Sequence, residues 1–272
     1  MLFNIDLMKQ YVVLLFLFFV IQNSSKIFCS ETMDTATQLE MGYFRVSLYH
    51  TESSYKPEFS MYSKRQDIKV GNINVDYLSI TESQLQSDSD LSQSVLKIVV
   101  NPFGGFSWWG KVGSTQYKIK IPSYSYTNEL ETTNPGILLG LGLKYQVFPE
   151  TIITPGIVIE YSVSLTENRV DRLFNDGVYI GPVSNKVRNI ENQLSFNISK
   201  IFYKIEPYLG VKVNRNEIRL IDEESLGETR GSKDNIIIFL GSKLNLYKNE
   251  SLIFEVNYIG ETSISLGFNV GY

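Results

Sequence analysis

The 272-residue chain is poor in the side chains that most catalytic and metal sites need. It contains a single cysteine, Cys29, and a single histidine, His50. One sulfur atom cannot form an internal disulfide or a thiolate metal site. Catalysis by a nucleophile with a neighbouring base generally requires an imidazole beside the nucleophile. We therefore predict a protein that is not an enzyme, because a lone histidine near the end of a strand is far more often a solvated or interfacial side chain.

Excess charge of either sign and recognised cofactor motifs are also absent. The 25 basic and 29 acidic residues give a formal net charge of -4, which favours neither a nucleic acid partner nor an anionic surface. The chain has no Gly-rich phosphate loop, HExxH or CxxC motif. Two acidic groups, Asp88/Asp90 and Asp222/Glu223/Glu224, are expected to be solvated surface rather than weak cation sites. We predict no cofactor, no metal site and no nucleic acid partner.

Long hydrophobic runs are limited to one stretch near the start. The run from Tyr11 to Ile21 follows Met8 and Lys9 and has 11 residues, fewer than the ~20 that a helix needs to span a bilayer. We predict a cleaved signal peptide in residues 1–30, with translation starting at Met1 or at Met8, and a single domain over residues 31–272. Cys29 is expected to be removed or incidental, and lipid attachment there is the less favoured alternative.

What recurs through the rest of the chain is alternation of apolar residues with small or polar ones. Between 137 and 147 the odd-numbered residues are apolar, apart from the aromatic Tyr145, and the even-numbered ones include Gly140, Gly142 and Lys144. The range 157–165 repeats this pattern after a short turn, so the two ranges predict a β-hairpin. Further strands are predicted at 189–199, 203–214, 235–247, 251–260 and 264–272, and less regular ones at Leu39–His50, Glu58–Val70, Ile73–Thr81, Ser94–Asn101 and Phe106–Ile121. A break of the alternation between Val112 and Tyr117 predicts either a bulge or an excursion of the chain above the sheet.

The connections between these strands alternate in length. Short turns are expected at 71–72, 102–105, 149–150, 200–202 and 248–250, and longer polar connections at 51–57, 82–93, 122–134, 166–186 and 222–234. Strands of about ten residues with one apolar face, short turns at one end and long loops at the other are typical of a transmembrane β-barrel. The fold class predicted is an all-β, antiparallel up-and-down transmembrane barrel of 12 strands, with 10 strands as the alternative if the region before Ser94 forms fewer.

The last strand carries a family resemblance. Ile264, Leu266, Phe268, Val270 and Tyr272 place apolar residues at alternate positions and an aromatic residue at the end. Together with the export signal and the hairpins, this resembles the bacterial outer-membrane β-barrel proteins, of the small surface or porin-like type. The resemblance implies a Gram-negative outer-membrane location and contacts with outer-membrane lipid. It also implies recognition of the last strand by the barrel-assembly machinery.

The predicted function is an outer-membrane surface protein or a narrow porin-like channel for small solutes, whose long loops contact an extracellular partner. A secreted or periplasmic soluble β-barrel or adhesive domain that binds a ligand or partner is the alternative. If the barrel interpretation is right, seven charged residues face the lumen and either line a pore or pair with one another: Lys144, Glu160, Glu191, Glu206, Lys212, Lys243 and Glu255. Aromatic residues near the short turns predict one interfacial girdle: Phe106, Trp108, Trp109, Tyr145, Phe148, Tyr203, Tyr247 and Tyr272.

Overall fold

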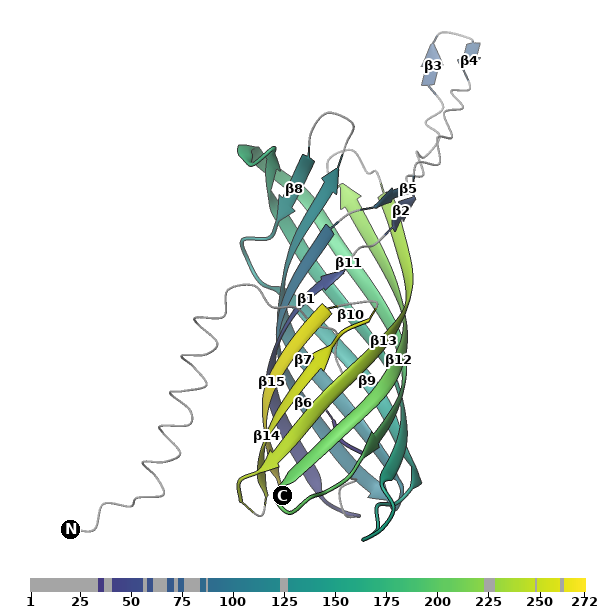
Figure 1. Ribbon diagram of the computed structural model, residues 1–272. Coiled ribbons are helices and arrows are strands. Elements are labelled where there is room, and N and C mark those ends of the chain that lie inside the picture. Colours follow the sequence, from purple (N-terminus) through teal and green to yellow (C-terminus); the bar gives the residue numbers. More distant parts are fainter. Residues whose placement is uncertain are drawn as a thin grey trace, which may run out of the picture.

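Ten antiparallel strands close into a barrel in the computed structural model (Figure 1). The structure describes residues 34–36, 41–55, 58–60, 68–70, 73–75, 84–86, 88–122, 127–222, 228–247, 249–259 and 262–272. The ring strands, in order around the barrel, are β1 (Phe44–Tyr55), β6 (Asp88–Phe103), β7 (Phe106–Pro122), β9 (Gly136–Phe148), β10 (Gly156–Asn175), β11 (Val178–Ser199), β12 (Ile205–Asp222), β13 (Glu228–Asn245), β14 (Glu250–Asn257) and β15 (Thr262–Gly271).

The first and last ring strands pair with each other and close the ring. Their register runs from Arg45 opposite Gly271 to Ser54 opposite Thr262. At the end of this seam the Phe44 N–H donates to the Tyr272 carbonyl at 3.1 Å, and the two rings stack with centroids 5.1 Å apart. Closure leaves no unpaired edge in the ring, which is what a hydrocarbon environment requires of a sheet. The predicted antiparallel barrel is confirmed.

Five shorter strands lie outside the ring. β8 (Thr127–Glu131) pairs with β7 and β10, and β2 (Glu58–Ser60) pairs with β13 and β5 (Gln84–Gln86). β3 (Ile68–Val70) and β4 (Ile73–Val75) form a separate two-stranded sheet. Among the described residues the ring therefore has the alternative count of ten, because the range 56–87, which was needed for twelve, contributes only short strands outside it. The remainder of the two strands predicted between 58 and 81, and the turn predicted at 71–72, lie outside the described residues.

Several connections at the long-loop end are shorter than predicted, because the strands continue into the ranges that were expected to be loops. β1 extends to Tyr55 and β6 begins at Asp88, where loops were predicted. The largest difference is in the range 166–186, where β10 and β11 form a long arm joined by a turn at Asp176 and Gly177. Both turn residues have positive φ, 48° and 79°, as a two-residue hairpin turn of this type needs. The Asn-Asp-Gly sequence at this turn is the signal for it.

The bulge predicted between Val112 and Tyr117 is absent, since the pairing of β6 with β7 runs without a shift from Asp88 opposite Lys120 to Val100 opposite Trp108. The two faces of the strand exchange their polarity instead. Closer to the short turn, the polar Lys111 points inward and is buried, and the apolar Val112 points outward and is exposed. Farther along the strand, the aromatic Tyr117 points inward and is buried, and the polar Gln116 points outward and is exposed. On β7 the inward face therefore changes from polar near the short turn to apolar near the long connection.

The outward face of the middle of the barrel is an exposed apolar belt. On β10 the belt runs from Ile157 to Leu165 at every second residue, and the next outward residue is Glu167. Eight steps of ~3.3 Å along a strand tilted by ~40° correspond to a height of about 20 Å. This is close to the apolar band of ~25 Å that lipid requires of outer-membrane barrels.

Six of the eight predicted aromatic residues near the short turns are exposed on this surface, whereas Phe106 is only partly exposed and Trp109 is buried. Trp108 is half exposed, and Tyr145, Phe148, Tyr203, Tyr247 and Tyr272 are exposed. Trp109 points inward instead and is only 5% exposed, so its place in the girdle was predicted wrongly. The alternation itself explains this difference, because Trp108 and Trp109 are neighbours on one strand and must face opposite sides.

Candidate functional site

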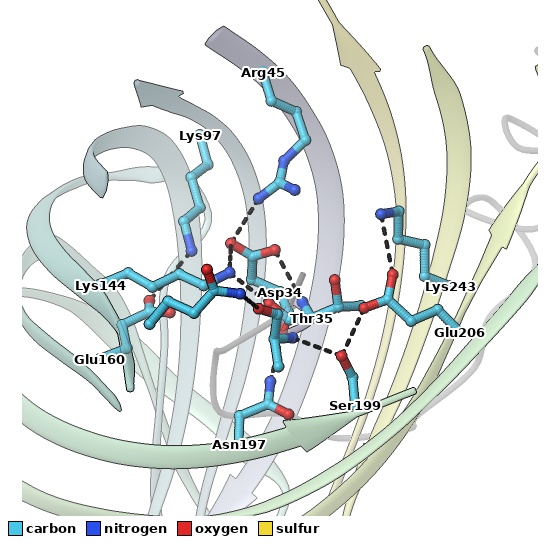
Figure 2. A network of polar contacts seen from close by, with 12 residues as sticks. Asp34, Thr35, Arg45, Lys97, Lys144, Glu160, Asn197, Ser199, Glu206 and Lys243 are labelled. Carbon is cyan, nitrogen blue, oxygen red and sulfur yellow. Dashed lines mark hydrogen bonds and ion pairs between the residues drawn. The ribbon is translucent and has the colours of Figure 1, made fainter. Parts of the chain in front are cut away.

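A short segment that precedes the barrel strands lies inside the barrel at its short-turn end. Figure 2 shows Asp34 and Thr35 surrounded by side chains from several ring strands. Asp34, Thr35 and Ala36 are at most 3% exposed. We call these three residues the plug segment. Two hydrogen bonds fix the backbone of the plug segment. The Asn197 side chain donates to the Asp34 carbonyl at 2.6 Å, and the Ala36 N–H donates to the Ser199 hydroxyl at 3.0 Å.

The plug segment carries one charge, and two cations hold it. The Asp34 carboxylate is 2.6 Å from the Arg45 guanidinium of β1 and 3.0 Å from Nζ of Lys144 on β9. Lys144 also donates to the Thr35 carbonyl. Burial alone would raise the pKa of Asp34, but the nearby positive charges of Arg45, Lys144 and Lys97 outweigh burial and hold this pKa well below its usual range. Asp34 is therefore a buried anion that anchors the plug segment.

The charges around this anchor form two further ion pairs. Lys97 Nζ lies 3.4 Å from Glu160 Oε1 and 4.1 Å from the centroid of the Trp109 ring. On the opposite wall, Glu206 accepts from the Ser199 hydroxyl at 2.7 Å and pairs with Lys243 at 3.2 Å (Figure 2). Ser199 thus links the plug segment to the second ion pair.

A second polar group lies between β12 and β14. Lys212 Nζ is 2.7 Å from Glu255 Oε1 and donates to the Asn257 side chain at 2.9 Å. Glu255 also accepts from the Tyr208 hydroxyl at 3.0 Å. All four side chains are buried, and Lys212 additionally lies 4.6 Å from the centroid of the Phe239 ring. The charges of Lys212 and Glu255 are therefore paired and hydrogen-bonded by side chains of the barrel strands themselves.

Apolar side chains fill the interior beside and beyond these polar groups. One buried cluster consists of Tyr49, Val95, Leu138, Tyr208, Phe239 and Ile253. A second cluster, toward the long-connection end, consists of Leu91, Tyr117, Ile119, Leu130, Val170, Val187 and Ile218. The inward glycines make room for the larger rings: a Cβ on Gly142 would overlap the Trp109 indole, and one on Gly241 would overlap the Tyr208 ring.

The structure places the seven predicted lumen residues within these contacts. Lys144, Glu160, Glu206, Lys212 and Glu255 are buried, whereas Lys243 and Glu191 are partly buried. Glu191 accepts from the Asn214 side chain at 3.0 Å. The seven do not converge on one point, because Glu191 and the Lys212–Glu255 pair contact groups other than the plug segment.

Sequence reasoning missed the plug segment, Arg45 and Lys97. Arg45 and Lys97 could have been found, since each is a charged residue between two outward apolar neighbours on an alternating strand. Asp34 belongs to no periodic pattern, and only its charge distinguishes it.

His50 lies on the outward face of β1. Its Nδ1 is 2.9 Å from the Ser94 hydroxyl of β6, and its Nε2 is 3.5 Å from Glu52. Among the described residues there is no group of three or more His, Cys, Asp or Glu side chains that could hold a metal ion. No helix in the described part of the chain is long and apolar enough to cross a membrane. Of the predicted acidic groups, Asp88 and Asp90 lie opposite Lys120 and Lys118, whereas Glu223 and Glu224 fall outside the described residues.

No family model and no curated protein matches this sequence. Among solved structures, the chain is similar to the outer membrane protease OmpT from Escherichia coli, with a TM-score of 0.51 and 10% identity over 88% of this chain and 100% of that chain. The translocator domain of autotransporter NalP from Neisseria meningitidis gives a TM-score of 0.45 and 9% identity over 86% of this chain and 89% of that one. The outer membrane protein OprG from Pseudomonas aeruginosa gives 0.40 and 8% over 88% and 99%. At these identities the likeness concerns the fold alone: like OmpT, the chain forms a closed antiparallel β-barrel.

Proposed function

We propose that this protein is an outer-membrane surface barrel whose interior is closed. The observation that carries the proposal is the way the lumen is occupied. Most of its inward charges pair with one another or with the plug segment, Glu191 accepts a hydrogen bond from Asn214, and two apolar clusters lie beside and beyond these polar groups. Charges in an open aqueous pore can be solvated by water, whereas buried charges must be paired and hydrogen-bonded as they are here.

The end with the long connections is the part that would contact an extracellular partner. The β10–β11 arm, β8, and the β2–β5 pair beside β13 extend the wall there (Figure 1). Outer-membrane barrels carry their longer loops on the extracellular side. We therefore assign recognition to this end and a structural role to the interior.

A narrow porin-like channel is the second candidate. It is favoured by the plug segment, which is held by polar contacts and an ion pair rather than as a strand of the ring. Such contacts can be exchanged for water when the segment leaves. If the protein is such a channel, the plug segment opens and closes the lumen at the short-turn end.

Two experiments test the proposal in order. Outer-membrane fractionation with a heat-dependent gel shift in detergent tests the membrane barrel, and recovery of a soluble monomer without detergent would contradict it. Swelling of protein-loaded liposomes in a small sugar then separates the two candidates. A closed barrel gives no swelling above empty liposomes, and swelling that depends on sugar size supports the channel.

We further propose that the assembly machinery recognises the outward apolar face of β15. Leu266 and Phe268 of β15 lie opposite His50 and Leu48 of β1, at the seam that closes the ring. The variant Phe268→Asp should lower the yield of heat-shifted barrel without lowering export. The control Thr262→Asp adds the same charge at an exposed, polar residue of the same strand, and equal yields for the two variants would contradict the assignment.

No catalytic role is proposed for His50. Its contacts with Ser94 and Glu52 lie on regular, paired strands, whose N–H groups are used in the sheet. Acyl-transfer enzymes also need free donors for the oxyanion. Absence of labelling by a fluorophosphonate probe is the expected result, and labelling that the Ser94→Ala variant removes would show an active serine.

A further inference from the structure

One row of apolar residues winds round the outside of the barrel and shows how level and register are related. Its members pair in register from strand to strand, in this order: Leu165 of β10, Leu139, Val112, Leu96, Leu48, Phe268, Leu252, Leu244 and Ile205 of β12. In the other direction Leu165 leads through Ile190 to Glu217, which lies twelve residues beyond Ile205 on the same strand. At ~3.3 Å per residue and a tilt of ~40°, one circuit descends by about 30 Å toward the short turns, or about 3 Å per strand.

The apolar outward face ends at this row on three neighbouring strands. On β9, β15, β14, β13 and β12 further apolar outward residues follow above the row, such as Leu266 and Ile264 on β15. On β7, β6 and β1, by contrast, the outward residues above Val112, Leu96 and Leu48 are polar. We call the first two such residues on each strand the polar patch: Ser114 and Gln116 of β7, Ser94 and Ser92 of β6, and His50 and Glu52 of β1.

The polar patch lies at the level of the apolar belt of the opposite wall. Leu48 is four strands along the row from Leu165 and is therefore about 12 Å lower. Successive outward residues rise by about 5 Å, so His50 and Glu52 lie about 7 and about 2 Å below Leu165, where the belt ends on β10. On β1 the belt consists of the outward residues from Phe44 to Leu48 and is about 10 Å high, half of its height on β10.

The polar patch contains ionisable side chains that remain accessible from outside the barrel. His50 Nδ1 is 2.9 Å from the Ser94 hydroxyl, and its Nε2 is 3.5 Å from Glu52. The side chains of His50 and Glu52 are 19% and 22% exposed, and Ser94, Ser114 and Gln116 are exposed. Ionisable groups on the lipid face of a barrel are costly at mid-membrane and much less so at the interface. These side chains therefore need water or headgroups at their own level.

The wall stays polar above the patch, where the next outward residues are Ser54, Asp90 and Lys118. The patch is thus continuous with the solvated end of the wall and is not an island within the belt. A short apolar face can be matched by a locally thinner bilayer at modest cost. We propose that the outer leaflet is thinned over β1, β6 and β7, so that lipid headgroups and their water descend to the polar patch. This inference rests on the proposed outer-membrane location and is independent of whether the interior is closed.

Thiol accessibility at equal depth tests this proposal. The full chain, with Cys29 replaced by serine and one new cysteine, is folded into vesicles of phosphatidylcholine with 18-carbon chains and treated with a membrane-impermeant maleimide. The variants Ser94→Cys and Val163→Cys place the thiol about 4 and about 5 Å below the level of Leu165, on opposite sides of the barrel. The thiolate is the reactive form, and it needs water to form. Ser94→Cys should therefore react at least tenfold faster than Val163→Cys.

Asn192→Cys is the matched control, because Asn192 is a polar outward residue directly opposite Val163 but has the apolar Ile190 above it. It should react as slowly as Val163→Cys. Equally slow reaction of all three variants would overturn the thinning. If the slow Ser94→Cys variant also formed a disulfide-linked dimer on oxidation, the patch would belong to a contact between two copies instead. Equally fast reaction of all three would refute the membrane location on which the inference rests.

Discussion

The carboxylate of Asp34 lies 2.6 Å from the guanidinium of Arg45, inside the barrel and almost completely shielded from solvent. This pair joins a segment that belongs to no strand to the first strand of the ring. Together with the contacts from Lys144, Asn197 and Ser199, it explains how three residues can remain inside the barrel. Removing one charge of a buried pair leaves the other uncompensated, at a cost of about 3–5 kcal/mol.

Replacing Asp34 by asparagine should release the plug segment. The variant keeps the shape of the side chain but leaves Arg45 and Lys144 without their anion. Release can be followed by the rate at which a maleimide labels a cysteine placed at position 36, in a background where Cys29 is serine. Ala36 is fully buried, so labelling should be slow in the parent and at least about tenfold faster in the Asp34→Asn background, since 1.4 kcal/mol already gives a factor of ten.

The matched control for this prediction is Asp171→Asn. Asp171 accepts hydrogen bonds from Thr133 at the other end of the barrel and does not contact the plug segment. It should leave the labelling rate unchanged. Fast labelling in the parent protein would mean that the plug segment does not lie inside the barrel.

The Lys212–Glu255 pair should contribute strongly to the stability of the barrel. Changing Lys212 to methionine leaves Glu255 buried without its cation, and we expect a loss of about 3–5 kcal/mol in the free energy of unfolding. Urea titration of the barrel in lipid vesicles measures the loss. The exposed pair Arg215–Asp234 provides the contrast, because Arg215→Met should cost less than about 1 kcal/mol. Equal losses in the two variants would show that the interior pair is hydrated.

The inward glycines should be intolerant of a methyl group where an aromatic ring occupies the space. Gly142→Ala would push against the Trp109 indole, and overpacking of this kind typically costs about 1–3 kcal/mol. Gly104, in the turn between β6 and β7, has open space at its Cβ position, so Gly104→Ala serves as the control. A lower urea midpoint for the first variant alone is the expected result, whereas no difference between them would place Trp109 elsewhere.

Period-two alternation predicted the barrel because lipid imposes an apolar face on every spanning strand. It predicted the strands well where the outside is apolar and the inside polar, as in β9 and the first half of β10. It failed toward the outer end, where Tyr117 and Val170 turn inward and polar residues such as Gln116 turn outward. There the strands leave the hydrocarbon and behave like those of a soluble protein, so on β7 the pattern inverts without a shift in its register with β6.

The interior could be predicted only as a set of charges. Alternation identified Lys144 and Glu160 as inward residues, but it carries no information about which inward groups meet across the lumen. The partner of Lys144 is Asp34, more than 100 positions earlier in the chain. A three-residue segment without periodicity gives no signal that it will fold into the barrel, so pore and closed interior could not be separated from the sequence.

The central claim is that the interior is closed, and planar-bilayer recording of the purified barrel tests it most directly. If the interior is closed, the parent protein gives no stepwise currents. The Asp34→Asn variant gives none either, because the two apolar clusters remain in place when the plug segment leaves. Stepwise currents in the parent protein that change in the Glu160→Gln variant would contradict the account and show an open, charge-lined pore.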